Sequence, residues 1–94
     1  MSEMIDAAVK ELNQKTGGSF DGSAKFVVED EGTIMLDGEG ARAADEDAEV
    51  TLTADSDTFR EIFEGSLDPT SAFMSGRLKI DGDMGQAMKL AQVL

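Results

Sequence analysis

Carboxylates are the residues of this sequence with the greatest potential for chemistry, because 20 of its 94 residues are aspartate or glutamate. The acidic clusters at 45–49 (DEDAE) and 81–85 (DGDMG) could attract a cation, but neither has the glycine and terminal glutamate spacing of an EF-hand loop. The sequence contains no histidine and no cysteine, so the commonest general base and every thiolate nucleophile or ligand are missing. With no nucleophile elbow or glycine-rich phosphate loop to organise the carboxylates, we expect no enzyme, no bound metal and no cofactor.

The pair Asp55-Ser56 could mark a site of covalent modification. In acyl carrier proteins, a serine that follows an aspartate at the start of a helix bears the phosphopantetheine arm. Here the next residue is Asp57, where that motif has leucine or methionine, and the alternating pattern before the pair contradicts an all-helical carrier. Aspartate and serine are also favoured N-caps, because their side-chain oxygens accept hydrogen bonds from the first free N–H groups of a helix. We therefore interpret the pair as a helix cap.

Length and charge indicate one soluble domain, residues 1–94, with no affinity for nucleic acid. A chain of this size has room for a single hydrophobic core. The formal net charge is −12 with only eight basic residues, whereas DNA binding depends on lysine and arginine displacing counterions. Most of the charge lies in residues 29–57, where eleven acids and the single Arg42 give a net charge of −10. We interpret this segment as a solvated acidic face.

The sequence carries no signal for secretion or membrane insertion. Its first residues, MSEMIDAAVKEL, include acids and lack the apolar centre of a signal peptide. No run approaches the roughly 20 apolar residues that span a bilayer. We expect a cytoplasmic protein that makes at most transient contact with a membrane.

Helical spacing and strand alternation divide the chain into nine elements. Four helices are expected: one capped by Ser2 with the apolar stripe Ile5, Ala8, Val9 and Leu12, one from Asp55-Ser56 to Gly65 with Phe59, Ile62 and Phe63 on one face, one from Asp68-Pro69 to Gly76, and one after Asp83. Five strands are expected: 24–30 and 33–37 as a hairpin, a brief edge strand at 41–44, then 50–54 and 77–81 with Leu78 and Ile80 facing inward. The order is a helix, four strands of which the third is brief, two helices, a strand and a helix.

The last of these helices is apolar over more than half of its circumference. Its polar stripe consists only of Gln86, Lys89 and Gln92. A surface helix on a small domain normally has a narrower apolar face. Either this helix is deeply packed, or it covers something apolar, or it contacts a partner chain.

The C-terminal third, Phe63 to Leu94, resembles the signature of the sterol carrier protein 2 (SCP2) family. That signature has a Gly-x-Leu-x-Pro stretch, then Ala-Phe-x-x-Gly-x-Leu-x-Ile, then Gly-Asp-Met and an Ala-x-x-Leu helix. The matching residues are Gly65, Leu67 and Pro69, then Ala72, Phe73, Gly76, Leu78 and Ile80, then Gly82, Asp83 and Met84, and finally Ala87 and Leu90. The N-terminal half agrees with the family in the order of its elements. One departure is that Ile34 or Met35 replaces the aromatic residue usual on the second strand.

The resemblance implies an α+β fold in which helices cover a mixed five-stranded sheet and enclose a hydrophobic tunnel. It also implies a function, the non-catalytic binding or transfer of a sterol, fatty acid, acyl-CoA or other isoprenoid lipid with loose selectivity. The residues we expect to line the tunnel are apolar side chains of the second half: Phe59, Ile62, Phe63, Phe73, Met74, Leu78, Ile80, Met84, Met88 and Leu90. Spacing alone would assign the same residues to an ordinary core. Arg77, Lys79 and Lys89 could attract an anionic head group, but exposed residues of this kind more often serve solubility.

A second function class stays open. The apolar C-terminal helix could be a docking surface, and the domain would then be an accessory subunit of a lipid-modifying complex, such as one for ubiquinone synthesis. Lipid that co-purifies with the protein favours the first function, and a stable assembly without lipid favours the second.

Overall fold

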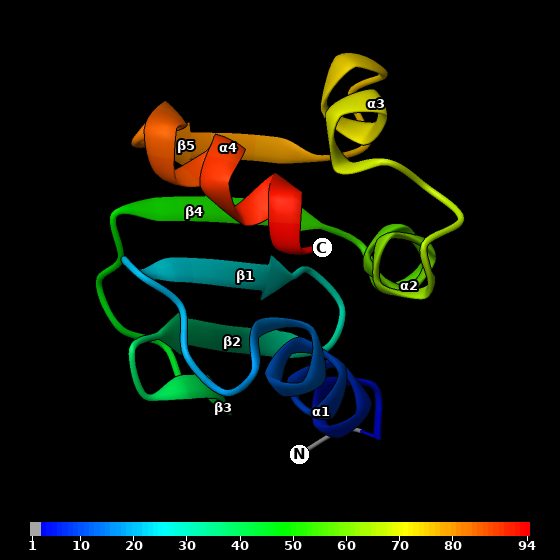
Figure 1. Ribbon diagram of the computed structural model, residues 1–94. Coiled ribbons are helices and arrows are strands. Elements are labelled where there is room, and N and C mark those ends of the chain that lie inside the picture. Colours follow the sequence, from blue (N-terminus) through cyan, green and yellow to red (C-terminus); the bar gives the residue numbers. More distant parts are fainter. Residues whose placement is uncertain (1–2) are drawn as a thin grey trace.

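The computed structural model describes residues 3–94 and confirms the predicted order of helices and strands (Figure 1). The elements are α1 (Glu3–Thr16), β1 (Ala24–Val28), β2 (Gly32–Asp37), β3 (Gly40–Ala43), β4 (Val50–Ala54), α2 (Ser56–Glu64), α3 (Pro69–Met74), β5 (Lys79–Gly82) and α4 (Met84–Val93). The predicted cap at Ser2 lies outside the described residues. Leu78 is buried as expected, although it precedes the first residue of β5.

The five strands form one mixed sheet in the order β3-β2-β1-β4-β5. Strand β1 lies at the centre and pairs antiparallel with β2 and parallel with β4, while β2–β3 and β4–β5 are antiparallel pairs. Because β1 and β4 run in the same direction, the chain must cross the sheet between β3 and β4. The α+β fold class and the mixed five-stranded sheet predicted from the sequence are confirmed.

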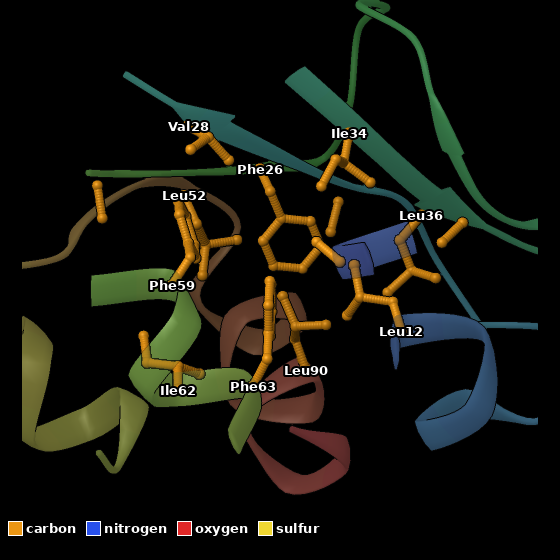
Figure 2. Close-up of a cluster of buried hydrophobic side chains, with 14 of the residues drawn as sticks. Leu12, Phe26, Val28, Ile34, Leu36, Leu52, Phe59, Ile62, Phe63 and Leu90 are labelled. Atoms are coloured by element: carbon orange, nitrogen blue, oxygen red, sulfur yellow. The ribbon is translucent and has the colours of Figure 1, made fainter. Parts of the chain in front are cut away.

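The hydrophobic core lies between the inner face of the sheet and the helices α1, α2 and α4 (Figure 2). Alternate residues of β1 point into it, so that Ala24, Phe26 and Val28 are buried whereas Lys25 and Val27 are only partly covered. Strand β4 repeats this pattern with Val50, Leu52 and Ala54. The period of two along each strand therefore sorts its residues between the core and the outer face.

Three phenylalanines fill the centre of this core. The ring of Phe26 meets the rings of Phe59 and Phe63 edge-on, at centroid distances of 5.8 and 6.1 Å. Phe59 and Phe63 are four residues apart on α2 and stack on each other at 5.7 Å. Such pairs contribute about 0.5–1.5 kcal/mol each beyond the burial of their surface. Together they hold α2 against the middle of the sheet.

The acidic segment between β3 and β4 crosses the outer face of the sheet. Lys25 of β1 forms an ion pair with Asp45 at 3.2 Å, and Arg42 of β3 forms one with Glu46 at 3.2 Å. Arg42 also donates two hydrogen bonds to Asp37, both 3.0 Å long, and these lower the pKa of the Asp37 carboxyl group. Met35, between Lys25 and Arg42 in the register, is only 1 % exposed although it points away from the main core. Part of the acidic face is thus ion-paired cover for the sheet.

The interpretation of Asp55 as a helix cap is confirmed. Its side chain accepts a hydrogen bond of 2.8 Å from the Thr58 N–H, and this bond lowers the pKa of the carboxyl group. The Ser56 hydroxyl binds the carboxylate of Asp30 at 2.8 Å. Helix α2 ends at Gly65, whose φ of 85° is a left-handed conformation that favours glycine.

Gly82 at the end of β5 should be essential for stability, because it combines a φ of 112° with a close neighbour. A Cβ atom at this position would collide with the Glu49 carbonyl oxygen, which accepts a 2.8 Å hydrogen bond from Asp83. We expect Gly82→Ala to lower the free energy of unfolding by about 2 kcal/mol or more. Gly38→Ala is the matched control, since nothing lies within 4 Å of its Cβ, and should change stability by less than about 0.5 kcal/mol. Urea denaturation measures both, and equal midpoints would contradict the role of Gly82.

Candidate ligand-binding groove

An apolar groove lies over the β4–β5 side of the sheet, between α3 and α4. Figure 1 shows α4 crossing in front of β4 and β5, with α3 beyond one end of β5. The groove has a volume of about 330 Å³. Its walls consist of Leu52, Pro69, Thr70, Phe73, Met74, Leu78, Ile80, Met84, Ala87, Met88, Ala91 and Leu94. No wall residue has an ionisable side chain, and Thr70 has the one polar side chain among them.

The structure brings together six of the ten residues expected at a ligand site. These are Phe73, Met74, Leu78, Ile80, Met84 and Met88. The other four lie elsewhere: Phe59, Ile62 and Leu90 are at most 1 % exposed inside the main core, and Phe63 is stacked on Phe59. The groove is therefore built by the segments after residue 68 together with β4, and α2 contributes no wall residue.

Six wall residues were not among those expected from the sequence: Leu52, Pro69, Thr70, Ala87, Ala91 and Leu94. Leu52 is the register partner of Ile80, so its place in the wall depends on the pairing of β4 with β5. Ala87 and Ala91 lie three residues after Met84 and Met88 on α4, which places them on the same side of the helix. Helical spacing could therefore have found the alanines, whereas Leu52 required the strand order.

The rim of the groove is apolar and accessible. The large hydrophobic side chains most exposed in residues 3–94 are Phe73 at 42 %, Met74 at 81 %, Met84 at 50 % and Met88 at 67 %, and all four border this groove. The wide apolar face of the last helix is thus divided in two. Leu90 is buried in the main core and Ala87 is buried in the groove wall, while Met84 and Met88 face the groove and solvent.

The basic side chains near the groove either bind an acidic residue or point away from the groove. Arg77 donates a 2.6 Å hydrogen bond to Glu61 on α2, which raises the pKa of the guanidinium group. The Lys89 ammonium group donates to the main-chain oxygen and the carboxylate of Asp21, at 2.8 and 3.3 Å. Lys79 neighbours Ile80 in β5, and side chains alternate along a strand, so Lys79 points to the outer face of the sheet. None of the three lines the groove.

A second and larger hollow, of about 630 Å³, lies between α1 and α2. Phe63, Met4 and two alanines contribute apolar surface to it, but it is also lined by four glutamates and Arg60. Charged side chains in a lining hold water, and moving them out of water is costly. The smaller, uncharged groove is therefore the better candidate for an apolar ligand.

The relationship of this chain to known proteins agrees with its fold. Residues 5–94 match the SCP-2 sterol transfer family, and the chain belongs to this family. In this part of the molecule, residues 3–94, no helix is long and apolar enough to cross a membrane.

The structural neighbours have the same fold. Sterol carrier protein 2-like 2 of Aedes aegypti superposes with a TM-score of 0.79 over 97 % of this chain and 96 % of its own, at 17 % identity. Sterol carrier protein 2 of Aedes aegypti, solved in complex with palmitate, superposes with a TM-score of 0.78 over 98 % of this chain and 94 % of its own, at 20 % identity.

Among curated proteins, hydroxysteroid dehydrogenase-like protein 2 of Xenopus laevis is 37 % identical over the whole of this chain, which covers 24 % of that protein. The human protein of the same name is 40 % identical over 70 % of the chain, which covers 17 % of it. The chain thus spans at most a quarter of the length of these relatives.

Substitutions at two residues of α4 should have different effects on stability, because one residue belongs to the core and the other to the groove wall. Leu90→Ala removes a fully buried side chain and should lower the free energy of unfolding by about 2–5 kcal/mol. Met88→Ala removes a side chain that is 67 % exposed, and should change it by less than about 0.5 kcal/mol. Thermal unfolding followed by circular dichroism checks both. A similar loss in the two variants would show that the groove wall belongs to the core.

Proposed function

We propose that this domain binds one lipid molecule in the groove between α3 and α4 and carries it without chemical change. The observation that carries the proposal is a wall of twelve residues with no ionisable side chain, bordered by four exposed hydrophobic side chains. An exposed apolar patch on a soluble domain commonly marks a ligand-binding or interaction surface. Membership of the SCP-2 sterol transfer family and the palmitate complex of the Aedes aegypti protein support a lipid as the occupant.

Transfer energies are sufficient for such binding without a specific polar contact. Each methylene group moved from water into an apolar site contributes about 0.8 kcal/mol, so twelve carbons contribute roughly 10 kcal/mol before the entropic cost of association. The groove volume of about 330 Å³ is at the lower end of the roughly 300–1,000 Å³ typical of small-molecule sites. A groove of this volume suits a single acyl or isoprenoid chain. A sterol, which is wider, would require the methionine side chains of the groove wall to move. Methionine is suited to that, because its side chain is flexible and polarisable.

The exposed rim also suits lipid exchange. Phe73, Met74, Met84 and Met88 surround the opening, so transient contact of this face with a membrane would let a lipid pass from bilayer to groove without crossing water. The wall holds no acid, base or nucleophile beyond the Thr70 hydroxyl, which supports a binding role without catalysis.

A second candidate function is that of an accessory module. Its support is that this chain matches only about a quarter of the Xenopus laevis relative, whose name refers to hydroxysteroid dehydrogenase. A domain of this kind would present its lipid to an enzyme, or dock on one through the rim of α4. Native mass spectrometry distinguishes the two: retained lipid supports the carrier, and a stable assembly without lipid supports the docking subunit.

The location of the lipid site is tested by a substitution that fills the groove with a large side chain. Ala91 is half-buried in the groove wall, so Ala91→Trp should occupy the cavity and weaken binding of a fluorescent fatty acid or sterol at least about tenfold. The matched control is Ala7→Trp, which places the same ring in the hollow between α1 and α2 and should leave the affinity unchanged.

Two outcomes would contradict the proposal. If the well-folded protein showed no saturable binding of either lipid, the binding function would be wrong. If Ala7→Trp abolished binding and Ala91→Trp did not, the lipid would occupy the hollow between α1 and α2.

A further inference from the structure

We propose that the groove selects lipids with an uncharged polar end over lipids that carry a carboxylate or phosphate. The inference rests on the proposed function, because it names the class of lipid that the same groove accepts. It is carried by the positions and partners of the charged groups around the groove.

The first argument is that the groove offers no cation to an anionic lipid. Arg77 is bound to Glu61, Lys89 is bound to Asp21, and Lys79 is on the opposite face of the sheet from Ile80. Recruiting Arg77 or Lys89 would leave an aspartate or glutamate of the protein without its partner. A head-group carboxylate would therefore gain one ion pair by breaking another.

The second argument concerns the backbone donors at the start of α4, which could otherwise hold an anion. The Asp83 carboxylate accepts hydrogen bonds from the N–H groups of Gly85 and Gln86, at 2.8 and 3.3 Å. These donors are thus occupied by an acid of the protein itself, directly beside the wall residue Met84. At the other wall, Asp68 precedes Pro69 at the start of α3. Both flanking acids disfavour a negative head group.

The third argument is the charge of the whole chain. A formal net charge of −12 repels an approaching anion, and although ions screen this repulsion beyond about 8 Å at physiological ionic strength, they do not reverse it. The polar side chain of the groove is Thr70, whose hydroxyl can both donate and accept a hydrogen bond. It matches the hydroxyl or carbonyl group of a neutral lipid.

The test compares two ligands that differ only at the polar end. Displacement of the uncharged dye Nile red by 1-dodecanol and by dodecanoate is measured at pH 7.5 and about 0.15 M salt. We expect dodecanol to bind at least threefold more tightly than dodecanoate. Equal affinity, or tighter binding of dodecanoate, would overturn the inference while leaving the lipid-binding function intact. Displacement by neither ligand would overturn the lipid-binding function, and this inference with it.

A charge placed at the rim provides the matched control. Met88→Lys puts a cation at an exposed position of the groove wall, and should raise the affinity for dodecanoate relative to that for dodecanol about three- to tenfold. Gln14→Lys adds the same charge at an exposed residue of α1, which contributes no wall residue, and should change the ratio of the two affinities by less than twofold.

If Gln14→Lys matched the effect of Met88→Lys, the selectivity would come from net charge alone and the local argument would be wrong. No response to Met88→Lys would also overturn it. Met84→Lys, at the 50 % exposed neighbour on the rim, repeats the test should Met88→Lys unfold the domain.

Discussion

The packing of Phe26 against Phe59 and Phe63 is the constraint on which the rest of the structure depends. These rings fill the space between the centre of the sheet and α2, with Ile34, Leu36 and α1 completing the core beside them. A close-packed interior leaves few voids larger than a water molecule. The hollow that remains on this side, between α1 and α2, is lined by charged side chains, whereas the uncharged groove lies at the other side, above β4 and β5.

The ion-paired acidic segment and the uncharged groove lie on opposite faces of the sheet. The acidic segment lies on the outer face of the sheet, where Lys25 and Arg42 hold it, whereas the groove opens on the face that carries the helices. The lowered pKa of Asp37 means that its ion pair with Arg42 stabilises the fold above the ordinary pKa of an aspartate. That contribution is lost as the pH falls through the lowered value, so acid should loosen the outer cover of the sheet before it affects the uncharged groove.

Helix α4 serves the core and the groove at once. Leu90 secures it to the sheet, the bond from Asp83 N–H to Glu49 holds its first turn, and Lys89 ties its side to Asp21. The opposite side of the helix carries Met84 and Met88, whose side chains are largely exposed to solvent and form part of the groove wall. A helix secured along one side can change the shape of the other through side-chain rotation, which is cheaper than moving the backbone. Flexible methionine is well matched to this task.

The sequence by itself determined the order of the elements, their approximate ends and the wide apolar face of the last helix. Alternation along 24–28 and 50–54 and the cap at Asp55 are local properties, and they appear in the structure as expected. Only the tertiary structure decided which apolar residues form core and which form groove. Phe59 and Phe73 are equally apolar, yet Phe59 is buried against Phe26 in the core and Phe73 borders the opening of the groove. The difference depends on strand order and helix placement, which bring together residues that are far apart in the sequence. The spacing of apolar residues within one helix or strand does not predict these long-range contacts.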